Sequence, residues 1–215
     1  VQDAASGREP GSGGGEGSQR RWKEEICQIL REIQAPLSPL LLRLCHWLLP
    51  KLLTRVFLGV QLHRGQLEMV LRAARTPEVP LVFLCSHQSQ VDGPLLSFIL
   101  LSQGIGLPRV AVGAGTSPRL RSLLQRLGGI FLPSGMAPTW SDLDEGLPGA
   151  VLDAYVQEVL RSRQPLVLFL EEPSASLRLA DPARRWLLRL LRTLRDGAVP
   201  DVLVIPVGIA YDVAP

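Results

Sequence analysis

The chain has 215 residues, of which 46% are hydrophobic and 5% aromatic, and it carries a formal charge of +3. This length and apolar fraction predict one globular domain with a substantial core and room for an appendage. The charge is too small to indicate nucleic-acid binding, so we expect no nucleic-acid partner. The three cysteines are odd in number and lack metal-ligand spacing. They favour free thiols in a reducing compartment and no metal site.

The N-terminal third divides into a polar leader and a helical lead-in. Residues 1–20 are rich in glycine, serine and charge, and we expect disorder there because they bury too little apolar surface to fold. Residues 21–79 follow a helical pattern, and its most apolar part, 40–62, is interrupted by charges such as Arg43 and Lys51. Those charges argue against a membrane span. Two interpretations of this part are open: a helix at a membrane interface, or a helix pair packed on the domain's own core.

From residue 80 onward, short apolar runs alternate with longer helical patterns. The runs predicted to be strands are 81–85, 110–113, 130–132, 166–170 and 202–207. Strands alternating with helices predict an α/β domain over residues 80–215, with a mainly parallel sheet and flanking helices. Because the chain stops straight after an apolar run, we expect it to be a fragment of a longer protein.

Two segments between the strands carry specific expectations. Residues 134–149 are rich in glycine, proline and aspartate, which predicts a loop ahead of a helix at 151–163. The helix predicted at 182–194 has one row of leucines and another of arginines. We expect the arginine row, at positions 185, 189 and 192, to form an exposed, solvated face. The alternative is a contact with anionic lipid headgroups or with the phosphates of coenzyme A.

The segment after the first predicted strand carries the candidate chemistry. His87 follows the strand, and Asp92 lies five residues later, where a helix is predicted to begin. Asp92 would accept helix-start N–H groups, stay ionised and hold the Nδ1–H of His87, leaving Nε2 free as a base. No nucleophile follows His87, so a substrate hydroxyl is the expected proton donor. The alternative is a loop histidine beside a helix-start aspartate.

We favour a buried structural thiol for Cys85 over a nucleophile.

Polar residues follow several of the predicted strands. In parallel sheets, ligands gather at the carboxyl ends of the strands. We therefore expect His87, residues 132–134, Glu171, Glu172 and Gly208 to converge on one edge.

Four sequence blocks together resemble the glycerol-3-phosphate acyltransferase family, within the wider glycerolipid acyltransferases. They are HQSQVD at 87–92, LGGIFL at 127–132, LFLE at 168–171 and VIPVGIAYD at 204–212. The lead-in QLEMV at 66–70 is similar to the mitochondrial branch, and the resemblance covers about residues 60–212.

The resemblance implies acyl transfer from acyl-CoA to the sn-1 hydroxyl of glycerol 3-phosphate, with His87 as general base and Asp92 as its orienter. It implies no metal, no acyl-enzyme and no cofactor beyond acyl-CoA as co-substrate. It also implies contact with membrane lipid at the mitochondrial outer membrane, with spanning segments beyond the point where this chain stops. The expected substrate-binding residues, within or beside the blocks, are Ser89, Gly129, Phe131, Ser134, Glu171, Glu172, Arg178 and Pro206.

The chain departs from the family pattern where arginines would hold the substrate phosphate. Pro133 and Ser134 replace arginines after the second block, and residues 171–176 read EEPSAS in place of Glu-Gly-x-Arg-Ser-Arg. Losing two charge-assisted contacts, each worth roughly 1.5–3 kcal/mol, would weaken phosphate binding by about two or more powers of ten. Candidate replacements, otherwise expected to be solvated, are Arg178, Arg119, Arg121 and Arg126. Three functions stay open: this acyltransferase, an acyltransferase with another acceptor, and a catalytically weakened membrane-associated scaffold.

Overall fold

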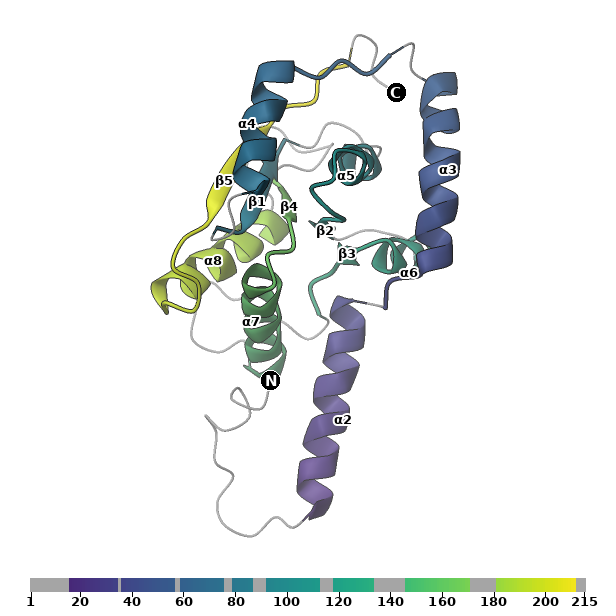
Figure 1. Ribbon diagram of the computed structural model, residues 1–215. Helices are drawn as coiled ribbons and strands as arrows, with labels where there is room; N and C mark the ends of the chain where they lie inside the picture. Colours follow the sequence, from purple (N-terminus) through teal and green to yellow (C-terminus); the bar gives the residue numbers. More distant parts are fainter. Residues whose placement is uncertain are drawn as a thin grey trace.

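The computed structural model describes residues 16–34, 36–56, 59–75, 79–86, 92–112, 118–133, 146–170 and 181–211. The helices are α2 (Glu16–Ile33), α3 (Pro39–Val56), α4 (Arg64–Arg75), α5 (Asp92–Ser102), α6 (Pro118–Arg126), α7 (Gly146–Arg161) and α8 (Asp181–Arg195). The strands are β1 (Leu81–Cys85), β2 (Arg109–Ala111), β3 (Gly129–Ile130), β4 (Leu166–Phe169) and β5 (Leu203–Val207). Helices and strands alternate from β1 to the end of the chain, as Figure 1 shows.

The five strands form one sheet in the order β3-β2-β4-β1-β5, and every neighbouring pair is parallel. The predicted α/β fold with flanking helices is therefore confirmed. Because all five strands run the same way, their carboxyl ends lie along one edge. β1 lies between β4 and β5, so the segment that leaves β1 starts between the segments that leave its two neighbours.

Alternate residues of the strands pack into two apolar layers. Val82 and Leu168 face one layer, which α2, α7 and α8 complete. Phe83 and Val167 face the other layer, together with residues of α4 and α5. A sheet covered on both faces needs near-continuous apolar strands, which explains why the central strand sequences show little polar alternation.

Two helices begin earlier than the sequence indicates. α2 starts at Glu16, within the segment predicted to be disordered, because a polar first turn gives no apolar period to mark it. α7 starts at Gly146, so the loop predicted over 134–149 is wrong from that residue onward. Pro148 lies in the first turn of α7, where its missing N–H leaves no helical hydrogen bond unmade. Residues 1–15 and 134–145 lie outside the described part of the chain.

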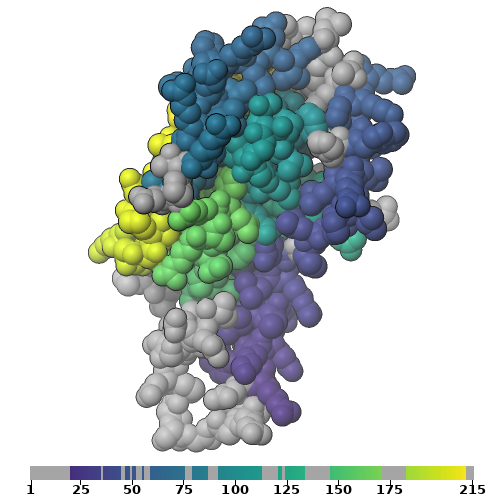
Figure 2. Space-filling model, viewed as in Figure 1, coloured from purple at the N-terminus to yellow at the C-terminus, as the bar shows by residue number. Residues whose placement is uncertain are grey.

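Helix α3 stands beside the sheet and covers neither of its faces (Figure 1). Its side chains at 40, 44, 47 and 48 form an apolar stripe at helical spacing, with Leu40 76% and Trp47 61% exposed. Figure 2 shows α3 along one edge of the surface. These four side chains therefore do not cover the domain's own core, whereas Leu41 and Leu42 on the same helix are half-buried. Within the described ranges, no helix has the length and apolarity needed to cross a bilayer.

Candidate active site at the carboxyl edge of the sheet

The chain leaves three neighbouring strands at one position along the sheet. Cys85, the last residue of β1, is in register with Phe169 of β4 and Val207 of β5. The N–H of Leu170 donates to the carbonyl oxygen of Cys85 at 2.8 Å, which extends the pairing one residue past β4. The segments that carry the first, third and fourth sequence blocks therefore start side by side.

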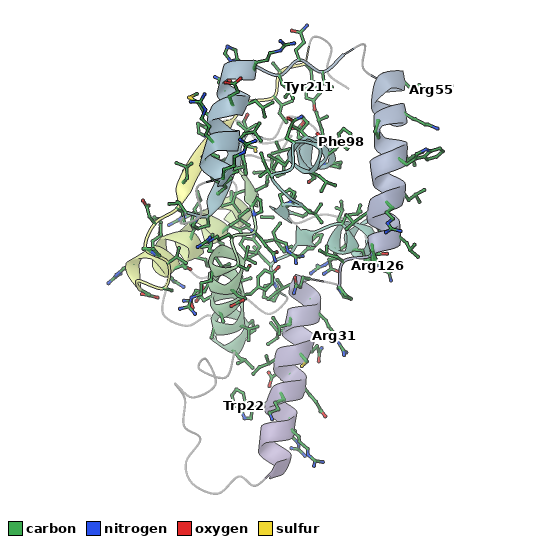
Figure 3. The ribbon with its side chains drawn as sticks, in the orientation of Figure 1. Trp22, Arg31, Arg55, Phe98, Arg126 and Tyr211 are labelled. Carbon is green, nitrogen blue, oxygen red and sulfur yellow. The ribbon has the colours of Figure 1, made fainter. Side chains whose placement is uncertain are left out.

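Asp92 is the buried charge of this edge. It is the first residue of α5 and is 0% exposed. A carboxylate in the first turn of a helix is stabilised by the helix dipole. The hydroxyl of Tyr211 donates a hydrogen bond to Oδ1 of Asp92. Figure 3 shows Tyr211 at the end of the molecule where the strands finish, near α5. The position of Asp92 at a helix start is confirmed.

Cys85 lies beneath this carboxylate in the apolar layer. Its burial, and secondly the negative charge of Asp92, raise the pKa of the thiol to about 12. A thiol with so high a pKa is almost entirely protonated at neutral pH and is a poor nucleophile. The structural role predicted for Cys85 is therefore favoured by the structure.

Six of the predicted site residues lie outside the described part of the chain. They are His87, Ser89, Ser134, Glu171, Glu172 and Arg178. The meeting of His87 with Asp92 therefore stays a prediction. The register of β1 and β4 brings the starts of the segments containing His87 and Glu171 together, whereas Ser134 follows β3.

The second sequence block lies at the opposite end of the sheet edge. β3 is three strands from β1, a separation of roughly 14 Å at the usual strand spacing. A Cβ at Gly129 would lie 2.8 Å from the backbone oxygen of Leu124, so glycine allows α6 to approach β3. Phe131 is 4% exposed, and its N–H donates to the carbonyl oxygen of Ile33. Both residues pack the scaffold here, and their roles in substrate binding stay predictions.

Pro206 lies on β5, opposite Leu84 of β1, and is exposed. Among the described strands, β5 forms one edge of the sheet. Proline is compatible with an edge strand because the N–H that it lacks is not needed on the outer side.

Of the candidate replacement arginines on α6, Arg121 and Arg126 have described side chains, and the side chain of Arg119 lies outside the described part. The guanidinium of Arg121 lies 4.6 Å from the centre of the Phe131 ring and donates to the carbonyl oxygen of Glu32 at 3.3 Å. Arg126 is exposed, and Figure 3 shows it beside the start of α3. The contacts of Arg121 thus hold it against the residue after β3 and the last turn of α2.

The arginine row of α8 differs from the expected exposed face. Arg189 is 2% exposed, its Nη1 donates to the carbonyl oxygen of Gly149 at 2.9 Å, and it forms an ion pair with Asp153. Arg192 lies 4.0 Å from the other carboxylate oxygen of Asp153. The prediction of an exposed row is therefore wrong at position 189, because α8 turns that position toward α7.

Tyr211 is the functional candidate to which the sequence assigned no role. It lies within the fourth block, but its partner Asp92 is 119 positions away. The signal that links them is the parallel pairing of β1 with β5, which brings the segments after both strands to one edge.

Comparison with known proteins identifies the family. The family model described as "Acyltransferase" matches residues 66–210. The chain is 44% identical over its full length to mitochondrial glycerol-3-phosphate acyltransferase 2 of Mus musculus, and 44% identical to the same protein of Homo sapiens. It is also 38% identical, over 88% of its length, to human mitochondrial glycerol-3-phosphate acyltransferase 1.

These matches cover only part of the relatives. The chain spans 27% of the length of the mouse and human isoform-2 proteins and 23% of the human isoform-1 protein. The resemblance that the four sequence blocks predict is confirmed: this chain belongs to the Acyltransferase family and is similar to the mitochondrial glycerol-3-phosphate acyltransferases, over its full length for isoform 2.

Proposed function

We propose that the protein containing this chain transfers a fatty acyl group from acyl-CoA to the sn-1 hydroxyl of glycerol 3-phosphate, forming lysophosphatidate. The observation that carries the proposal is the fully buried carboxylate of Asp92 at the carboxyl edge of a parallel sheet, five residues after His87. Ligands of such sheets bind at this edge. The names of the similar proteins support the same reaction.

In the proposed reaction, Nε2 of His87 accepts the proton of the glycerol hydroxyl as its oxygen attacks the thioester carbonyl carbon. The carbon–sulfur bond then breaks, and the leaving sulfur takes the proton back from the imidazolium. Asp92 holds the Nδ1–H of the imidazole and stabilises its charged form. General base catalysis of this kind contributes roughly a hundred- to ten-thousandfold. Acyl-CoA is a co-substrate, and the proposal needs no covalent acyl-enzyme.

The experiment compares wild type with His87→Ala in the full-length protein, with acyl-CoA and glycerol 3-phosphate. Loss of acyl transfer by a variant that melts at the wild-type temperature supports the proposal. Turnover unchanged by the substitution rejects the mechanism.

The identity of the acceptor needs its own test, because arginines are missing at 133–134 and 171–176. One candidate replacement, Arg121, already contacts the ring of Phe131 and donates to the carbonyl oxygen of Glu32. Acceptors are therefore compared at fixed acyl-CoA: glycerol 3-phosphate, a lysophospholipid and an uncharged alcohol. Fastest transfer to glycerol 3-phosphate supports it as the acceptor. Fastest transfer to one of the other two compounds identifies that compound as the acceptor instead.

A catalytically weakened scaffold is the second candidate function, and the same missing arginines favour it. It predicts that the biological role survives His87→Ala. A cellular phenotype that disappears with this single substitution contradicts it.

We also propose that the protein is bound to the mitochondrial outer membrane and that α3 contacts anionic lipid there. The stripe formed by Leu40, Leu44, Trp47 and Leu48 is exposed, and Lys51 and Arg55 continue it at helical spacing. Nζ of Lys51 lies 3.5 Å from the centre of the Trp47 ring. The helix has no acidic residue. Apolar and basic residues on one face are typical of interfacial helices, and each basic residue near an anionic surface contributes about 1 kcal/mol.

Flotation with vesicles of phosphatidylcholine and phosphatidylinositol tests this contact. Replacing Leu44 and Trp47 by serine in the full-length protein should reduce the bound fraction. Met69→Ser, at an exposed position on α4, is the matched control. Equal binding by the wild type, the stripe variant and the control would contradict the proposal.

A further inference from the structure

Tyr211 joins the carboxyl edge from a strand that carries none of the catalytic residues proposed above. It follows β5 by four residues, and β5 pairs with β1. Its phenol donates to Oδ1 of Asp92, which is otherwise enclosed by the protein. A carboxylate has about four lone-pair directions on two oxygens. A fixed donor on Oδ1 therefore restricts the rotation of the whole carboxylate.

We propose that Tyr211 is a positioning residue for acyl transfer, whose phenol fixes the orientation and moderates the basicity of the Asp92 carboxylate. The inference rests on the function proposed above, in which Asp92 orients His87. A hydrogen bond donated to a carboxylate spreads its negative charge and makes it a weaker partner for an imidazolium. Tyr211 then lowers the pH at which the base becomes available, while it holds the geometry that the base requires.

The phenol is suited to act as a permanent donor. Burial, the hydrogen bond to Asp92 and the charge of Asp92 all raise the pKa of Tyr211 above its ordinary value. The hydroxyl therefore stays protonated through the range in which histidine titrates. Among the described residues, the charge of Asp92 also helps to raise the pKa of the Cys85 thiol to about 12, so this thiol likewise stays neutral there.

The test is the pH dependence of acyl transfer by full-length Tyr211→Phe. We expect kcat to fall about tenfold, with the KM for acyl-CoA unchanged, since an oriented hydrogen bond to a charged group is lost. We also expect the apparent pKa of the acidic limb to rise, because a carboxylate that has lost the hydrogen bond from the phenol stabilises the imidazolium more strongly. A purely structural tyrosine would change the melting temperature and leave kcat and the pH profile unmoved.

Tyr155→Phe is the matched control. The hydroxyl of Tyr155 donates to Oε1 of Gln34 at 2.9 Å, between α7 and the end of α2, so the same atom is removed far from Asp92. Its pH profile should match wild type. If His87→Ala abolishes transfer while Tyr211→Phe retains the wild-type kcat and profile, the inference fails and the proposed function stands. Transfer unchanged by His87→Ala instead rejects the proposed general-base mechanism, on which the inference rests.

The contact has a readout that does not depend on turnover. The ionisation of the Tyr211 phenol is measured by ultraviolet titration, as the difference in absorbance change between wild type and Tyr211→Phe. Asp92→Asn should shift its ionisation to lower pH, since the carboxylate charge raises the pKa of Tyr211. An ionisation that does not move when Asp92 is replaced would overturn the inference, whatever the kinetics.

Discussion

Asp92 and Asp153 each bind a donor inside the fold, and their surroundings differ. Asp92 joins the start of α5 to the segment after β5 at the edge where parallel strands end. Asp153 joins α7 to α8 through Arg189, and the same arginine donates to Gly149 of α7. The hydroxyl of Thr193 donates to the carbonyl oxygen of Arg189 within α8, so these contacts of the second cluster involve α7 and α8 alone.

The difference separates a polar group that holds the scaffold from one placed for chemistry. The Arg189 cluster connects two helices that cover one face of the sheet. Asp92 lies where ligands of such sheets bind. We therefore expect changes at Arg189 to lower stability and changes at Asp92 to lower activity.

The largest expected effect follows Asp92→Asn. Asparagine keeps an oxygen for the Tyr211 hydroxyl but loses the charge that would stabilise an imidazolium. We expect kcat for acyl transfer to fall by roughly a hundred- to ten-thousandfold, with the free energy of unfolding changed by less than about 1 kcal/mol. Steady-state kinetics and urea unfolding of one preparation measure both. A variant that loses stability but keeps full activity in its folded fraction would show that Asp92 has a structural role and not a chemical one.

Arg189→Met tests the other cluster. It leaves Asp153 without its closest positive partner, and removing one member of a buried ion pair costs about 3 kcal/mol. The midpoint of urea unfolding should fall, while the kcat of the folded enzyme stays at the wild-type value. Arg195→Met, at the exposed end of α8, is the control and should change stability by less than about 0.5 kcal/mol. Equal losses in the two variants would contradict the structural role.

The smallest expected effect concerns the thiol beside Asp92. With the pKa of Cys85 raised to about 12, the thiol is protonated at pH 8 and buried. In a Cys27→Ser, Cys45→Ser background, iodoacetamide should therefore label it only after unfolding. A Cys85→Ser, Cys45→Ser protein should label quickly at Cys27, which is exposed. Similar rates in the two folded proteins would show that the thiol is accessible.

The sequence predicts the sheet well because its strands are buried on both faces. Runs such as 81–85 and 166–170 are continuously apolar, bounded by proline or polar residues, and separated by helical patterns. Each of these patterns is set by residues close together in the sequence, so it can be read without knowing the fold. The same kind of local pattern places Asp92 at a helix start.

Other features depend on which distant residues meet, and no local pattern gives that information. The period of α8 puts residues 185, 189 and 192 on one side, but does not say which side packs against α7. In the structure Arg189 is on the side that packs against α7 and is buried. Leu191, which the sequence predicts within the apolar row, is 58% exposed. The role of Tyr211 has the same origin, because its contact depends on the pairing of β1 with β5.

The proline in β5 has a consequence for association between chains. The N–H of Leu203 donates to Pro80, just before β1, so residues 203, 205 and 207 direct their backbone groups toward β1. Residues 204 and 206 direct theirs outward, and Pro206 has no proton to offer there. An incoming strand from a second molecule would find a donor at Val204 but none at the next outward position. Within the described sheet, Pro206 thus disfavours pairing of a further strand with the outer side of β5 without weakening the pairing with β1.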